Sequence, residues 1–260
     1  MQVYNNELYH YGVLGMKWGI RKAKNFDTYK EAKVQIKTNK DGSKTIPQNF
    51  MFNRVGKGSL DINESGGLYV SHGKTDAARY IKALGPNTLR KLTGLAGTDV
   101  QHIRVKGEIK SPSDEQYMKA TNKFLLQNKD IIKSLSESVH SMTYNEDLSK
   151  DITVKDVERA VKNPNDKDSK KLAYAVSSML GDPDYKKETM KMYDLYKKEG
   201  FDAIPDIHDR YDGTSETATI IINTSKVEVS STTKITKDVY KSGKKYVKSL
   251  EKLKVNDIMK

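Results

Sequence analysis

Strand-like segments lie at both ends of the central part of this chain, and helical segments lie between them. Four short segments are either apolar or alternate between apolar and polar residues. Two come early, at residues 50–55 and 67–71, and two come late, at residues 201–205 and 218–222. Residues 113–200 instead show mainly helical spacing. A doubly wound sheet would need strands that alternate with helices along the whole chain. The observed order therefore predicts the α+β class, with a helical middle.

Capping signals place the first helices. Thr75 or Asp76 is expected to cap a helix that runs to about residue 84. The sequence from Ser113 to Gln116 resembles a capping box, and the sequence from Thr153 to Asp156 follows the same logic. We expect helices to begin at both places, the first continuing to about residue 139.

Other stretches have clear local signals of their own. Asp182 and Pro183 are expected to begin a helix that Gly200 ends. One face of that helix carries large side chains that we expect in the core, namely Tyr185, Thr189, Met192, Tyr193 and Tyr196. A further helix over residues 86–95 and one strand over residues 100–109 are also expected.

The positive charge of the chain is concentrated in its two ends. Residues 1–40 hold 8 basic and 3 acidic residues, and residues 226–260 hold 10 and 4, so the stretch from 41 to 225 contributes only +1 of the net +12. Such ends suit nucleic-acid phosphates or an acidic protein surface, although lysine-rich ends also simply maintain solubility. The scarcity of arginine argues against base-specific reading. We divide the chain into an N-terminal docking arm (1–40), a central domain (41–230) and a basic helical tail (231–260).

Composition excludes several classes of protein. Without cysteine the chain forms no disulfide, thiolate metal site or thiol nucleophile. We expect no membrane partner, because no apolar run approaches the roughly 18 residues of a spanning helix, and the first ten residues do not have the pattern of a signal peptide.

An unusual segment lies near the N-terminus. Residues 9–22 contain three glycines and the only tryptophan of the chain. The glycines disfavour an isolated helix and allow tight bends, while Val13, Leu14, Met16 and Trp18 could anchor the segment. We interpret the segment as a peptide that docks onto a partner. The alternative is an irregular lead-in that packs on its own domain.

This segment resembles the signature His-x-Gly-x-x-Gly-Met-Lys-Trp-Gly-x-Arg of phage structural proteins, found near portal and minor-capsid genes in phages of Firmicutes. The residues that carry the resemblance, and that we expect to dock, are His10, Gly12, Gly15, Met16, Trp18 and Arg21. The resemblance implies a virion-associated protein whose partners are capsid, portal or neck proteins. It also implies a location in the virion, and in the host cytoplasm during assembly or after ejection.

The body of the chain resembles the same phage proteins, which are similar to ADP-ribosyltransferases. Residues 52–80, 109–113 and 200–229 carry this resemblance and extend it over roughly residues 50–230. It implies a split mixed sheet in which the strand of Arg54 lies beside the strand of residues 220–222. The glycine- and tryptophan-rich leader would then be free to bind a larger assembly.

The resemblance also implies roles for particular side chains. Arg54 would bind a phosphate of NAD, since a guanidinium suits a pyrophosphate, and Ser71 would support the nicotinamide pocket. His72 and Tyr80 would line the same pocket. NAD is the cofactor implied if the domain is active.

The catalytic glutamate of the family is displaced in this chain. In the family it directly precedes the final apolar strand, where it stabilises positive charge on the ribose. Here Thr219 has that position, and the nearest glutamate is Glu216. A three-residue offset in a strand moves a side chain by about 10 Å and turns it to the other face. We therefore expect a degenerate transferase domain, with an active NAD-dependent transferase that modifies a host protein as the alternative.

An acidic loop precedes this strand. Asp206, Asp209, Asp212 and Glu216 surround Gly213, and such oxygen ligands suit calcium. The spacing nevertheless departs from the EF-hand pattern, and the five histidines lack ligand spacing. We expect no metal site.

Overall fold

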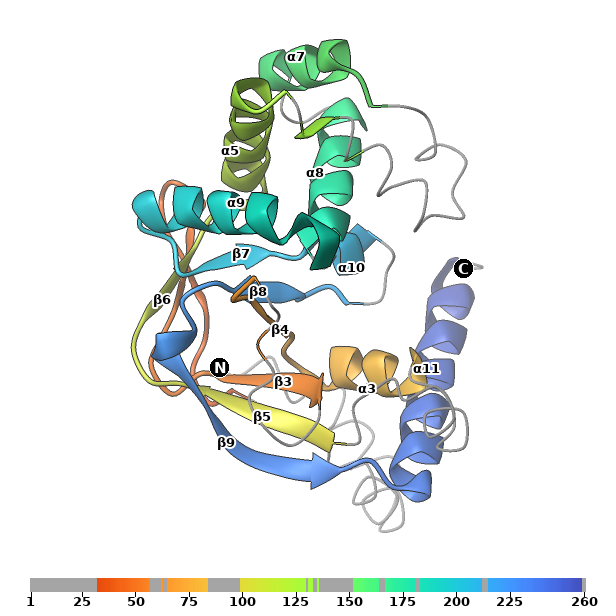
Figure 1. The fold of residues 1–260 in the computed structure, drawn as a ribbon. Coiled ribbons are helices and arrows are strands. Elements are labelled where there is room, and N and C mark those ends of the chain that lie inside the picture. Colours follow the sequence, from red (N-terminus) through yellow and green to blue (C-terminus); the bar gives the residue numbers. More distant parts are fainter. Residues whose placement is uncertain are drawn as a thin grey trace.

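The computed structural model describes residues 32–56, 62, 65–83, 99–129, 131–132, 135, 152–163, 167–180, 183–211 and 215–258. Their fold is α+β, as the order of sequence patterns predicted. Strands form the lower part of the molecule in Figure 1, and most helices gather above them. The segment of residues 9–22 and the expected helix over residues 86–95 lie outside the described residues.

The described strands form three small sheets. The first has the order β3-β5-β9, with β3 at Met51–Gly56, β5 at Asp99–Val105 and β9 at Val227–Lys234. The second has the order β4-β8-β7, with β4 at Leu68–Val70, β8 at Thr219–Ile221 and β7 at Ala203–Pro205. The third has the order β1-β2-β6, with β1 at Lys37–Thr38, β2 at Lys44–Ile46 and β6 at Ile109–Ser111.

The strand pairing corrects two expectations. Every registered pair between described strands is antiparallel, so the expectation of a mixed sheet is wrong. The strand of Arg54 also does not lie beside β8, because β3 pairs with β5 and β8 is the centre of another sheet. The wholly buried β8 is flanked by the buried β7 and by β4, in which Tyr69 is partly buried. Among the described residues, an isolated bridge between Asn53 and Ser71 joins the two sheets.

The single strand expected over residues 100–109 is in fact two strands in different sheets. β5 ends at Val105, opposite Val227, and β6 begins at Ile109, opposite Ile46. Between them the Lys106 N–H donates to the carbonyl oxygen of Lys226 at 2.8 Å, and the chain bends at Gly107. Alternation alone could not reveal this break, because Val105 and Ile109 are both buried in the same core.

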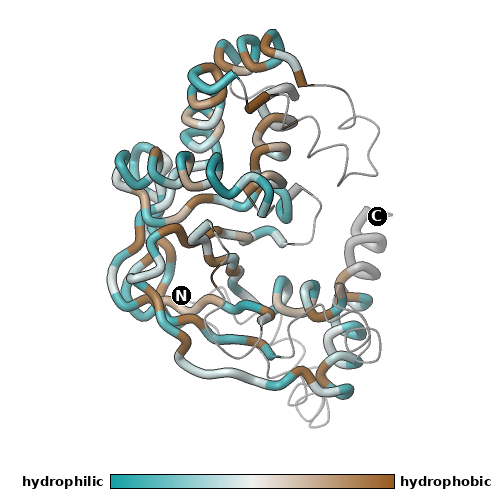
Figure 2. Tube along the Cα trace, in the orientation of Figure 1, coloured by the Kyte–Doolittle hydropathy of each residue, from teal (hydrophilic) through white to brown (hydrophobic). Residues whose placement is uncertain are grey.

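The helical half encloses the largest core. It consists of α5 (Asp114–Gln127), α7 (Val154–Lys162), α8 (Lys167–Leu180) and α9 (Lys186–Lys198). Both expected capping boxes are confirmed, one between Ser113 and Gln116 and one between Thr153 and Asp156. Figure 2 shows hydrophobic stretches along α8, which packs against the other three helices of this half.

α9 begins later than expected. Pro183 begins a short 3₁₀ turn, η3 (Pro183–Tyr185), and the α-helix starts at Lys186, while Asp182 lies outside the described residues. The expected core face is largely confirmed, with four residues buried and Tyr185 partly buried, the four being Thr189, Met192, Tyr193 and Tyr196. Gly200 ends this helical region with φ of 84°, a left-handed conformation that favours glycine.

Two helices cover the end of the β3-β5-β9 sheet. α3 (Lys74–Ala83) begins at Lys74, so Thr75 and Asp76 lie in its first turn and do not cap it. α11 (Lys237–Ile258) packs against α3, as Figure 1 shows. Two shorter helical turns, α10 (Ile207–Tyr211) and η4 (Thr224–Lys226), lie near β8.

Candidate functional site

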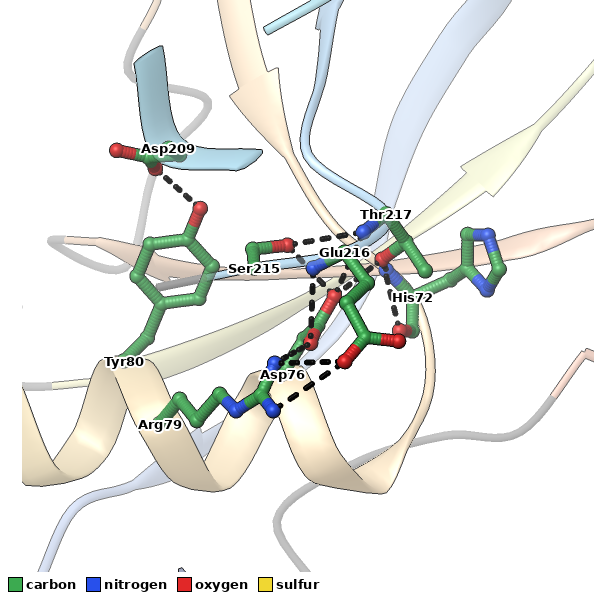
Figure 3. A network of polar contacts seen from close by, with 8 residues as sticks. All are labelled: His72, Asp76, Arg79, Tyr80, Asp209, Ser215, Glu216 and Thr217. Carbon is green, nitrogen blue, oxygen red and sulfur yellow. Dashed lines mark hydrogen bonds and ion pairs between the residues drawn. The ribbon is translucent and has the colours of Figure 1, made fainter. Parts of the chain in front are cut away.

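Asp76, in the first turn of α3, is the centre of a buried polar cluster. Only 3% of this residue is exposed. Its carboxylate accepts hydrogen bonds from the Ser215 hydroxyl at 2.6 Å, the Thr217 hydroxyl at 2.6 Å and the Thr217 N–H at 3.0 Å (Figure 3). The N–H of Glu216 lies 3.4 Å from its other oxygen. We call Asp76, Arg79 and residues 215–217 the Asp76 cluster.

Thr217 extends this cluster to β4. Its hydroxyl accepts a hydrogen bond from the N–H of His72 at 2.9 Å and lies 3.0 Å from the carbonyl oxygen of the same residue. His72 directly follows β4 and Ser71, while Thr217 directly precedes Ala218 and β8. The cluster therefore joins α3, the end of β4 and the approach to β8.

Arg79 connects the cluster to Glu216. Its guanidinium lies 3.3 Å from a carboxylate oxygen of Glu216 and 3.6 Å from Asp76. The side chain of Glu216 is 71% exposed, whereas that of Arg79 is 19% exposed. Glu216 lies ahead of β8, which begins at Thr219, so its carboxylate projects from the preceding loop toward α3.

Ser71 and His72 lie where the two sheets meet. Ser71 is buried, and its backbone exchanges hydrogen bonds of 2.7 and 3.0 Å with Asn53 of β3. The imidazole of His72 makes edge contacts with the rings of Phe50 at 5.3 Å and Phe52 at 6.3 Å. Burial lowers the pKa of His72 to about 4, so the ring is neutral at pH 7.

Arg54 lies one residue beyond this junction, on β3. Side chains alternate along a strand, so Arg54 shares the face of Phe52, whose ring contacts His72. Its guanidinium donates to the side-chain oxygen of Gln101 on β5 at 3.3 Å. A Cβ at Gly56 would lie 2.6 Å from that oxygen and 2.8 Å from the guanidinium, so this glycine permits the close approach.

Tyr80, on α3, faces α10 across the site. Its hydroxyl donates a hydrogen bond to the carboxylate of Asp209 (Figure 3). Burial, reinforced by the charge of Asp209, raises the pKa of the Tyr80 hydroxyl far above its usual range. The structure thus brings Ser71, His72, Tyr80 and Glu216 to one region, with Arg54 on the adjoining strand.

Asp206 is a second buried carboxylate beside this region. It accepts from the Ser177 hydroxyl at 2.8 Å and lies 3.4 Å from the N–H of Asp209. Burial, together with the negative charge of Asp209, raises the pKa of Asp206 to about 6. Among the described residues, no group of three or more histidines and carboxylates has the arrangement of a metal site.

A third polar cluster surrounds Asp202 at the start of β7. Burial disfavours the charged form, but hydrogen bonds from Lys226 at 2.7 Å, the Lys110 N–H at 3.1 Å and Asn223 at 2.8 Å lower the pKa of Asp202 overall. A cavity of about 580 Å³ lies beside it, with Lys197 on its wall. Both carboxylate oxygens of Asp202 accept hydrogen bonds from protein donors, and these bonds join the start of β7 to β6 and η4.

Sequence reasoning missed the residues that build the site. Asp76 was expected only as a helix cap, and nothing singled out Ser215 or Thr217. A carboxylate in the first turn of a helix is favourable in any protein, so its burial left no sequence signal. The expected docking residues all lie outside the described part of the chain.

Comparison with known proteins gives one partial match. A family model described as a family of unknown function (DUF7211) matches residues 1–25, a range that contains the glycine- and tryptophan-rich segment. No curated protein and no solved structure matches the chain. Within the described residues, none of the helices combines the length and apolar character needed to cross a membrane.

The Asp76 cluster predicts a sharp contrast between two acidic residues. Asp76→Ala should lower the free energy of unfolding by about 2–4 kcal/mol, because it leaves buried hydroxyl and N–H donors without their acceptor. Glu216→Ala should change it by less than about 0.5 kcal/mol, because its ion pair is exposed. Urea unfolding of both variants measures the difference. Equal losses would contradict the assignment of Asp76 as the structural centre.

The raised pKa of Asp206 predicts a dependence of stability on pH. The pKa of Asp206 is about 6 in the folded protein, above the ordinary value of 3.8, so its contribution to stability is fully present below about pH 3.8 and is lost as the pH rises to about 6. Asp206→Asn should remove this loss and stabilise the protein above pH 7 by on the order of 1–3 kcal/mol. Thermal unfolding from pH 4.5 to 8 tests this. A variant that is less stable than the parent at pH 8 would refute it.

Proposed function

We propose that this chain is a virion-associated protein of a tailed bacteriophage, with an ADP-ribosyltransferase-like domain that no longer transfers ADP-ribose. In this proposal residues 9–22 attach the protein to the capsid, portal or neck, or retain it in the head. The observation that carries the proposal is the resemblance of this segment to the phage signature, with Met16 and Trp18 in place. The family of unknown function matches the same part of the chain.

The geometry around β8 supports a degenerate site. A transferase needs a fixed carboxylate where positive charge develops on the ribose. Thr219 begins β8 and Thr217 lies two residues before it, and the hydroxyl of Thr217 is occupied by His72 and Asp76. The carboxylate of Glu216 is exposed and paired with Arg79. An exposed, paired carboxylate on a loop is poorly suited to that task.

Other features favour a domain derived from such a transferase. Two antiparallel sheets meet at the bridge between Asn53 and Ser71, which gives a split arrangement of strands. Arg54 lies beside that junction, on the face of β3 whose rings contact His72. In this proposal Arg54 takes the place of the phosphate-binding arginine and Ser71 that of the second-strand serine, with the strand of Arg54 beside β5 and not beside β8.

Incorporation into particles tests the role of the N-terminal segment. Deletion of residues 9–22 should abolish recovery of the protein with purified virions, because the segment supplies the docking anchors. Trp18→Ala should lower its copy number strongly, since buried tryptophans dominate docking energies. Tyr11→Ala, at a variable position of the signature, should leave it nearly unchanged. Normal recovery of the deletion variant, measured by quantitative mass spectrometry, would reject the proposal.

An active transferase is the second candidate, because Ser71, His72, Tyr80 and Glu216 do share one region. We expect no transfer of label from NAD to host proteins by the full chain. Transfer that is lost in Arg54→Ala and in Glu216→Ala would instead establish an enzyme that uses NAD. Arg104→Ala and Glu228→Ala are matched controls, since these residues form an exposed ion pair elsewhere on the β3-β5-β9 sheet.

A further inference from the structure

The C-terminal helix α11 presents two different faces. Its half-buried and buried positions are mainly apolar, and they comprise Val239, Tyr240, Gly243, Tyr246, Val247 and Leu250. Its exposed positions include a set of lysines, namely Lys237, Lys241, Lys244, Lys245 and Lys248. We call these five residues the lysine stripe.

The spacing of the lysine stripe places its charges in one line. With 3.6 residues per turn, the five positions fall within an arc of roughly 100° on the helix surface, opposite the apolar face. The stripe extends along about 16 Å of the helix axis, at 1.5 Å per residue. Within the described part of the chain, none of its lysines makes an ion pair with an acidic side chain.

Packing on α3 fixes the orientation of the stripe. Val247 of α11 is buried against Ala78 and Ile81 of α3. The ammonium group of Lys74 lies 4.7 Å from the centre of the Tyr246 ring, on the same inward side. Since the apolar face is held by α3, the lysines project outward from a supported helix.

We propose that the lysine stripe binds the phosphate backbone of duplex DNA without reading its sequence. A line of closely spaced lysines complements the regular negative charge of a duplex and gains free energy by releasing counterions. From Lys237 to Lys248 the helix contains no Arg, Asn or Gln, the residues that most often read base edges. The inference rests on α11 alone and not on the virion assignment.

The same helix is poorly suited to other polyanions. A membrane-surface helix must insert its apolar face into the lipid, whereas the apolar face of α11 is covered by α3. Single-stranded nucleic acid is usually held by aromatic rings on which bases stack. Tyr240 and Tyr246 belong to the inward face and are not exposed beside the lysines.

Helix α9 offers a matched comparison. It also carries exposed lysines, including Lys187, Lys191 and Lys198, but the exposed Asp194 lies among them on the same helical face. Asp194 lies between Lys191 and Lys198 along α9, whereas the exposed Asp238 of α11 lies at the edge of the lysine stripe, one turn from Lys241. A variant with four α9 lysines replaced has the same change in net charge as one with four stripe lysines replaced.

The salt dependence of DNA binding by the full chain tests the proposal. Fluorescence anisotropy with a 30-base-pair duplex of arbitrary sequence would be measured between 50 and 200 mM NaCl. The variant with glutamine at 241, 244, 245 and 248 should bind at least about tenfold more weakly, and its slope of log affinity against log salt should be shallower by roughly 3–4. Arginine at the same four positions should restore both quantities.

The control variant carries glutamine at 187, 191, 197 and 198 and should retain most of the affinity and slope. Equal losses in both glutamine variants would overturn the proposal, because net charge alone would then explain binding. The proposal would also be overturned if the protein bound phosphatidylserine vesicles more tightly than the duplex and the stripe variant lost only its binding to the vesicles. Circular dichroism and thermal unfolding establish that each variant is folded before binding is compared.

Discussion

The buried carboxylate of Asp76 is the interaction on which the arrangement around the candidate site depends. A buried charge is tolerated only when hydrogen bonds compensate the loss of water, and here the loop before β8 supplies several of them. Through Thr217 the same contacts reach the end of β4. One side chain thus sets the position of α3 relative to β4 and β8, and α3 in turn supports α11.

This arrangement has a direct chemical consequence. The contacts that hold residues 215–217 leave Glu216 on the outer side of the loop, where Arg79 binds it. The hydroxyl of Thr217 points inward and bonds to other protein groups. The loop that would have to present a catalytic carboxylate is therefore organised as a structural connection between a helix and two strands, which is the basis for proposing a decayed transferase site.

Predictions from sequence succeeded where the determining interactions are local. Capping boxes at Ser113 and Thr153 involve residues three positions apart, so the chain reveals them directly. The core face of α9 follows from helical periodicity in the same way. The prediction of one strand over residues 100–109 failed because the chain bends there between two strands. At the bend the Lys106 N–H bonds to the distant Lys226, a contact that no local pattern reveals.

The α+β class, most of the helices and strands, and the concentration of basic residues at the two ends could all be predicted from the residues alone. The folded chain was needed to see which strands share a sheet, that Asp76 is buried, and that the lysines of α11 face outward while α3 covers its other side. The physical reason is one of range. Periodicity and capping act within a few residues, whereas the pairing of β5 with β9 and the burial of Asp76 depend on groups more than a hundred positions away.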